Sequence, residues 1–151
     1  MTQKQHLRII SRVLFSCHNQ GMKTYEEYNP NPKGRRVDDC TVRAISKALG
    51  ATWDKAYDLL SDKGREMGDM MHADSVWGAV LREKGFVRHA IPNTCPYCYT
   101  AADFCRDYPT GVYVLGFGGH VATVVNGRIF DTWDSSDLVP VFFYRRRAYY
   151  L

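Results

Sequence analysis

The sequence predicts an α+β domain in which helices come first and antiparallel strands follow. Apolar residues recur at helical spacing in the first half of the chain, between residues 40 and 85. The second half alternates apolar and polar residues, and Asn126-Gly127 marks a tight two-residue hairpin turn. Internal repeats and low-complexity linkers are absent from the sequence, so we expect one domain.

The first 21 residues are interpreted as an N-terminal extension that precedes a single domain over residues 22–151, because Met22 opens a second plausible start. The extension contains apolar residues that are compatible with a short helix. Arg12 interrupts its apolar stretch, which is too short for a signal peptide. We therefore expect a cytoplasmic protein.

Capping residues set the expected helix boundaries. Asp38 or Asp39 is suited to cap a helix that stops at Gly50, Thr52 to cap a second, and Asp74 to cap a third. The remaining expected elements are, in chain order, a strand over 86–91, a short helix near 100–107, a strand over 112–117, the hairpin, and a last strand over 139–146.

Composition limits the classes of function. The 151 residues are 45% hydrophobic, which allows a sizeable core, and no apolar run is long enough for a membrane span. The formal charge of +4 is modest and comes partly from three arginines at 145–147, so nucleic-acid binding is not expected. Five cysteines, an odd number, favour a reducing compartment.

The hairpin places a histidine near an acid. A two-residue turn pairs Val125 with Arg128. In every further pair, the residue number falls by one on the first strand and rises by one on the second. His120 and Asp131 then become diagonal neighbours on one face, roughly 7 Å apart at Cα. Asp131 could simply satisfy a half-buried His120, or it could orient a reacting imidazole.

A nucleophile is available in RRVDDCTVRAISKALG, where Cys40 begins an amphipathic helix. The positive end of the helix dipole and a nearby imidazolium both favour the thiolate, which is the nucleophilic form of cysteine. Asp38 and Asp39 oppose this, so their side chains should turn to backbone amides or to Arg43. An inert, buried cysteine is the alternative interpretation.

These residues resemble the papain-like cysteine peptidases: a cysteine opens the first long helix, a histidine begins a much later strand, and an acid and a tryptophan follow. The segment Asp131-Thr132-Trp133 resembles the Asn-Ser-Trp of that family, in which the tryptophan covers the histidine. Asp39-Cys40 is similar to the compact bacteriocin-leader peptidases, which use aspartate as the third triad member. The DCxxRA and GHxxxxxxGxxxDTWDS elements also resemble small papain-like proteins of phages and gut bacteria.

The resemblance covers roughly residues 29–145 and implies N-terminal helices packed on a C-terminal antiparallel sheet. One feature departs from the family, which usually has a glutamine about six residues before the cysteine to bind the oxyanion; Gly34 stands there. Losing an oxyanion donor costs about 10²- to 10³-fold in rate. The alternative candidates for a substitute donor are the Cys40 amide, the side chain of Asn29 or Asn31, or the guanidinium of Arg35 or Arg36.

The CPYC segment, Cys95 to Cys98, resembles the glutaredoxin active-site motif but lies about two thirds along the chain, where that motif is not expected. A zinc site would combine Cys95, Cys98 and Cys105 with His89 or His72, although no second CxxC is present. A surface loop with reduced thiols is the simplest interpretation.

The resulting hypothesis is a thiol hydrolase, a cysteine peptidase that acts on peptide or protein substrates without a cofactor or metal. Cys40 would be the nucleophile, His120 the base and acid, Asp131 its orienter, and Trp133 a cover over the His-Asp contact. The alternatives are a catalytically silent papain-like binding module, such as a phage protein that docks on a host component, and a CxxC redox or zinc protein.

Overall fold

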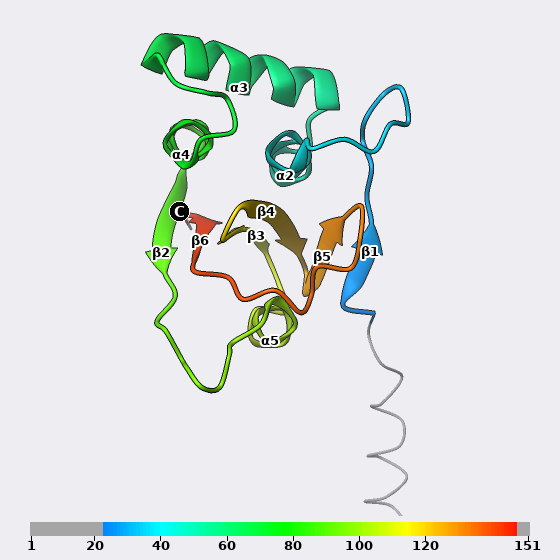
Figure 1. The fold of residues 1–151 in the computed structure, drawn as a ribbon, viewed down its shortest axis with the longest axis vertical. Helices are drawn as coiled ribbons and strands as arrows, with labels where there is room; N and C mark the ends of the chain where they lie inside the picture. Colours follow the sequence, from blue (N-terminus) through cyan, green and yellow to red (C-terminus); the bar gives the residue numbers. More distant parts are fainter. Residues whose placement is uncertain (1–22, 148–151) are drawn as a thin grey trace, which may run out of the picture.

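The computed structural model describes residues 23–147 and shows a six-stranded mixed sheet with helices on both faces (Figure 1). In chain order the elements are β1 Tyr25–Glu27, α2 Cys40–Leu49, α3 Trp53–Met67, α4 Asp74–Glu83, β2 Phe86–Ala90, α5 Ala101–Asp107, β3 Val112–Phe117, β4 His120–Val125, β5 Arg128–Asp131 and β6 Phe142–Arg146. This arrangement confirms the α+β class. The predicted extension, residues 1–21, lies outside the described residues.

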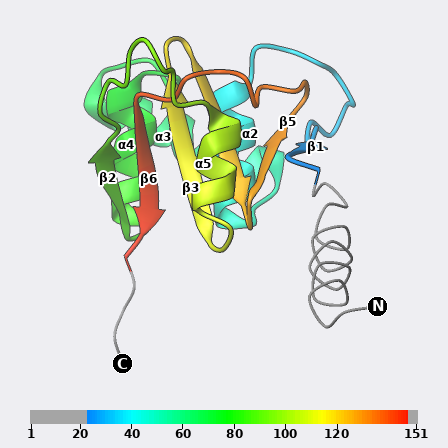
Figure 2. The ribbon, with the colours of Figure 1, turned by 90° about the horizontal axis from the view of Figure 1, so that it is seen from below.

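The elements form layers. Helices α2 and α4 lie on one face of the sheet, α3 lies over both of them, and α5 covers the opposite face (Figures 1 and 2). Within residues 23–147, no helix has both the length and the apolar character that a membrane span requires.

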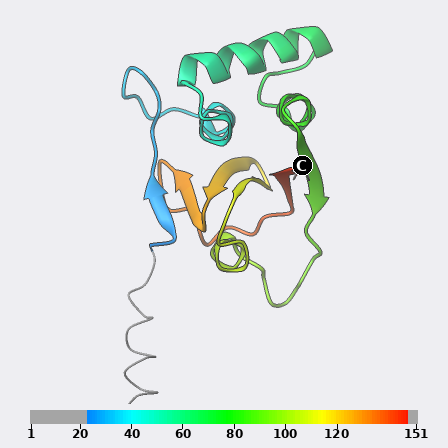
Figure 3. The ribbon, with the colours of Figure 1, turned by 180° about the vertical axis from the view of Figure 1, so that it is seen from behind.

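The strand order is β1-β5-β4-β3-β6-β2, so β1 and β2 form the two edges (Figure 3). The expected antiparallel pairing joins β5, β4, β3, β6 and β2, but β1 pairs with β5 in parallel. Strand β1 has only three residues, Tyr-Glu-Glu, which is too short for an alternating pattern to be visible. Its position depends on pairing with β5, a strand about 100 residues later in the chain.

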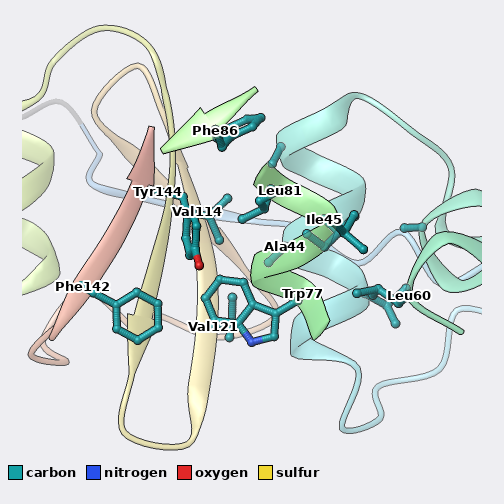
Figure 4. Close-up of a cluster of buried hydrophobic side chains, with 14 residues drawn as sticks. Ala44, Ile45, Leu60, Trp77, Leu81, Phe86, Val114, Val121, Phe142 and Tyr144 are labelled. Atoms are coloured by element: carbon teal, nitrogen blue, oxygen red, sulfur yellow. The ribbon is translucent and has the colours of Figure 1, made fainter. Parts of the chain in front are cut away.

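The larger part of the core fills the space between α2, α4 and the sheet (Figure 4). Trp77 and Leu81 of α4 and Ile45 of α2 are completely buried there against side chains of β3, β4 and β6. The Trp77 ring stacks on Phe142 with ring centroids 5.6 Å apart. A smaller apolar cluster under α5, centred on the buried Phe104, fills the other face.

The helix boundaries follow the predicted caps with one difference. Gly50 ends α2 with a left-handed φ of 62°, and the Thr52 hydroxyl accepts a hydrogen bond from the Lys55 amide at 3.2 Å. Helix α4 begins at Asp74 itself, with Ala73 at the cap position. The Asp74 carboxylate instead accepts from the indole of Trp77 at 3.0 Å, which removes it from capping.

The hairpin has the predicted turn and register. Asn126 and Gly127 have φ values of 48° and 74°, as a two-residue turn of this kind requires. Val125 pairs with Arg128 and Val124 with Ile129. The register predicted from the two-residue turn is therefore confirmed.

Gly116 tests the packing of the core. A Cβ at this position of β3 would lie 2.2 Å from the Phe142 ring, which is held by its stack on Trp77. We expect Gly116→Ala to lower the free energy of unfolding by about 1 to 3 kcal/mol, measured by denaturant titration. Gly118→Ala is the matched control, because nothing lies within 4 Å of its Cβ. Equal effects of the two substitutions would contradict this packing.

Candidate active site

Cys40 and His120 meet because α2 lies across the sheet at β4. The buried Thr123 hydroxyl of β4 donates to the Ala44 carbonyl of α2 at 2.7 Å, which fixes the helix on the strand. Cys40 is the first residue of α2 and His120 the first residue of β4. Both side chains line the same cleft, where the His120 imidazole lowers the pKa of the Cys40 thiol.

His120 also contacts Asp131, as the hairpin register predicts. Its Nε2 lies 2.6 Å from Asp131 Oδ2, which leaves Nδ1 as the ring nitrogen for Cys40. The β4–β5 pairing ends at Thr123 and Phe130, before either residue is reached. His120 and Asp131 are the end residues of their strands and lie on the α2 side. Ala122 and Ile129 of the same strands pack in the cluster under α5, so strand alternation alone does not predict the layer that the side chains of His120 and Asp131 meet.

The Asp131 carboxylate is fully engaged and only 1% exposed. Oδ1 accepts from Arg43 Nη2 at 2.9 Å and from the Thr132 amide at 2.8 Å. Oδ2 accepts from His120 and, at 2.8 Å, from the buried Ser135 hydroxyl. Four donors hold the carboxylate in one orientation, so it presents a fixed charge to the imidazole.

Arg43 is buried between two carboxylates. One nitrogen of its guanidinium pairs with Asp131 and the other with Asp39, and the residue is 5% exposed. Asp39 precedes Cys40 and also accepts from the Trp53 indole at 2.8 Å. The expected turn of the Asp39 side chain to Arg43 is confirmed, so most of its charge next to Cys40 is compensated.

Asp39 occupies the N-cap position of α2, but its side chain makes no capping hydrogen bond. Both carboxylate oxygens are used by Arg43 and Trp53. The first-turn amides of α2 thus have no acceptor from the cap side chain, and Cys40 is the first residue of that turn. They are positioned to stabilise negative charge that develops there.

The electrostatics favour a thiolate and an imidazolium. Burial opposes ionisation of Cys40, but hydrogen bonding and charge interaction with His120 and the Val121 amide outweigh burial and lower the Cys40 pKa below 9.0. Burial also works against the charged imidazole, yet Asp131 and Cys40 raise the His120 pKa to about 9. Despite burial, the hydrogen bonds from His120 and Ser135 lower the Asp131 pKa.

These shifts link the site to folding. The His120 pKa rises from 6.5 to about 9 on folding, so its stabilising contribution is complete below pH 6.5 and is lost as the pH rises through about 9. The lowered Asp131 pKa contributes stability above its ordinary value of 3.8, which is lost in more acidic solution.

Trp133 lies beside the imidazole. Its ring centroid is 5.2 Å from that of His120, and 47% of the residue is exposed. The ring therefore lies against the imidazole, where the sequence places a cover over the contact between His120 and Asp131.

Two adjoining depressions flank the Cys40–His120 pair. One, of about 620 Å³, extends toward α3 and the loop before α4. The other, of about 460 Å³, extends toward Trp133 and is also lined by Arg36. A chain laid across both depressions would pass over the Cys40 sulfur.

The loop before α2 brings only some of the predicted oxyanion donors to the cleft. Asn31 Oδ1 accepts from the Lys33 amide at 2.9 Å, and the Asn29 amide group donates to the Arg35 carbonyl at 3.3 Å. These bonds close the loop on itself, so neither Asn31 nor Arg35 lines the cleft. Arg36 does line it, and donates to the Thr132 carbonyl and to Glu27.

The other cysteines do not form a comparable site. Cys95 and Cys98 are exposed in the loop before α5, whereas Cys105 is buried within that helix. Among residues 23–147, no group of three or more His, Cys, Asp or Glu side chains is arranged to hold a metal ion. The predicted zinc ligands, including His72 and His89, are therefore not gathered.

Two contributors to the site were missed by sequence reasoning. Arg43 was expected to meet an acid near Cys40 but not Asp131, and Ser135 was given no role. The DCxxRA and DTWDS elements contain both residues, but a single sequence shows no contact between segments 88 residues apart.

Comparisons of the chain with models of protein families, with curated proteins and with solved structures find no match. The chemistry of the site therefore has to be argued from its own residues.

Thiol labelling tests the ion pair. Iodoacetamide at neutral pH should modify Cys40 before the exposed Cys95 and Cys98, because the imidazolium stabilises its thiolate. Cys105 is the internal control, since burial raises its pKa to about 11. His120→Ala should slow Cys40 labelling and move its pH profile to higher pH. Faster modification of Cys95 or Cys98, read by peptide mass spectrometry, would contradict the assignment.

Removal of Arg43 tests the buried network. Arg43→Met leaves Asp39 and Asp131 without their shared cation, and should lower the free energy of unfolding by about 3 to 5 kcal/mol. Arg65→Met on the exposed side of α3 is the matched control and should have an effect within about 0.5 kcal/mol. If chemical denaturation gave the same decrease in the free energy of unfolding for both variants, the buried network would not contribute the expected stability.

Proposed function

We propose that this protein is a thiol hydrolase of papain-like type, most simply a cysteine peptidase, with Cys40, His120 and Asp131 as its triad. The observation that carries the proposal is the relay in which Asp131 holds Nε2 of His120 and leaves Nδ1 for the Cys40 thiol. The lowered pKa of Cys40 in an open cleft supports the same assignment.

In the first half of the reaction, the Cys40 thiolate attacks the carbonyl carbon of an amide and forms a tetrahedral oxyanion. His120, as imidazolium, gives its Nδ1 proton to the departing amine as the carbon–nitrogen bond breaks. The products of this step are a free amine and an acyl group held as a thioester on Cys40. Asp131 stays ionised and orients the imidazole throughout.

In the second half, neutral His120 removes a proton from a water molecule, which attacks the thioester carbonyl. Breaking the carbon–sulfur bond releases a carboxylic acid and restores the Cys40 thiolate with protonated His120. The Trp133 ring beside His120 limits water at the contact with Asp131.

The oxyanion requires hydrogen-bond donors, and the usual glutamine is missing. The amide of Cys40 at the start of α2 is suited to this role, because Asp39 does not cap the helix. The guanidinium of Arg36 lines the same cleft. A helix terminus and a cation can together replace the amide side chain in stabilising negative charge.

The missing glutamine also favours a second candidate function, a catalytically silent papain-like module that binds a partner through this cleft. The two functions differ in what the buried relay is for. In the enzyme it activates Cys40, whereas in the silent module it only stabilises the contact between α2 and the hairpin.

Asp131→Asn separates these functions. In the enzyme, the amide weakens stabilisation of the imidazolium, so kcat/KM on a peptide or amide library should fall about 10²- to 10⁴-fold. The free energy of unfolding should change by about 1 to 3 kcal/mol, because the donors around residue 131 lose one acceptor site.

Asp137→Asn is the matched control, since Asp137 is exposed in the same loop. It should leave both kcat/KM and the melting temperature unchanged. If the wild-type protein hydrolyses nothing in the library, and Cys40→Ala retains partner binding, the silent module is the correct function.

A further inference from the structure

The depression on the α3 side of Cys40, here called the α3-side pocket, lies between α3, the α3–α4 loop and the residues around His120. Its volume of about 620 Å³ exceeds that of any single side chain. Cys40 and His120 belong to its lining, so a group that fills it belongs to a substrate residue near the reacting carbonyl.

One wall of the α3-side pocket is aromatic. The rings of Trp53 and Tyr57, one helical turn apart on α3, are stacked with centroids 5.1 Å apart. Met71 from the α3–α4 loop and Val121 after His120 continue the apolar lining. Such walls suit the hydrocarbon stem of a long side chain and the flat face of a guanidinium.

The charges at this pocket are predominantly acidic. Asp38 and Asp74 line it, as do His72 and His120, and neither lysine nor arginine does among residues 23–147. Asp38 makes no hydrogen bond or ion pair within the described part of the chain, and Asp74 uses one oxygen for Trp77. Asp39, the third acid, is already compensated by Arg43.

The depression on the Trp133 side has the opposite character. Arg36 and Arg43 both line it, whereas no arginine or lysine among residues 23–147 lines the α3-side pocket; His120 borders both depressions. A basic side chain of a bound peptide is therefore favoured toward α3 and disfavoured toward Trp133.

We propose that the α3-side pocket binds an arginine or lysine side chain of the substrate, with its stem on Trp53 and Tyr57 and its cation near Asp38 and Asp74. The substrate of the site is then a basic peptide segment, with the basic residue next to the cleaved bond or one residue from it. This inference rests on the proposed function for its position relative to the cleaved bond, whereas binding in the pocket requires no catalysis.

The test compares arginine with citrulline, which has nearly the same shape and no charge. Short peptides that carry one such residue at successive positions are incubated with the protein, and mass spectrometry locates the cleaved bond. Arginine at one position should raise kcat/KM about two- to fivefold over citrulline, as an added partly exposed charge interaction allows. Glutamate at that position should be the poorest.

The Asp38→Asn/Asp74→Asn variant should remove the preference, so that kcat/KM becomes equal for the arginine and citrulline peptides. Asp58→Asn, an exposed charge next to Tyr57 that does not line the pocket, should retain the preference. Cleavage with equal rates for arginine and citrulline at every position, or a preference unchanged in the double variant, would overturn the inference.

A binding measurement separates this inference from the proposed function. Titration of Cys40→Ala with acetyl-arginine amide or acetyl-citrulline amide, followed by NMR shifts at Tyr57 and Met71, requires no catalysis. Tighter binding of the arginine compound without any cleavage by the wild type would retain the pocket and reject the hydrolase. Cleavage without this difference in binding would retain the hydrolase and reject the pocket.

Discussion

The buried pairing of Arg43 with Asp131 is the interaction on which the rest of this site depends. It joins the helix that carries Cys40 to the hairpin that carries His120, through two charges that are almost completely removed from water. Burying these charges is costly unless each is paired and hydrogen-bonded. Asp39, Thr132 and Ser135 complete the hydrogen bonding, and no buried side-chain nitrogen or oxygen among the described residues lacks a partner.

The same network controls charge at the reacting atoms. Arg43 compensates Asp39, whose carboxylate would otherwise oppose a thiolate on the next residue. It also leaves one oxygen of Asp131 for His120, so the imidazole is held in one orientation and its charged form is favoured. Because Asp39 is occupied by Arg43 and Trp53, the amides at the start of α2 are not capped by it. One arginine thereby holds Asp131 beside His120, compensates the carboxylate next to Cys40 and keeps Asp39 from capping α2.

Some features of the site were predictable because they depend on local chemistry. The Asn126-Gly127 turn set the register that places His120 near Asp131, and the spacing after Asp39 gave the bounds of α2. The edge strand β1 was missed because three residues show no period, and Asp74 was expected as a cap because its contact with Trp77 is not visible in sequence. Asn31 and Arg35 were expected at the cleft, but hydrogen bonds within their own loop direct that segment elsewhere.

The sequence by itself determined the helix of Cys40, the hairpin of His120 and Asp131, and their α+β order, since turns, caps and periodicity act between near neighbours. Only the tertiary structure decided that α2 crosses β4, that the guanidinium of Arg43 reaches Asp131, and that the pocket beside Cys40 is bounded by α3. These contacts join segments far apart in the chain. They arise because the apolar faces of α2 and the sheet must be buried together, which places the polar groups at their ends within hydrogen-bonding reach.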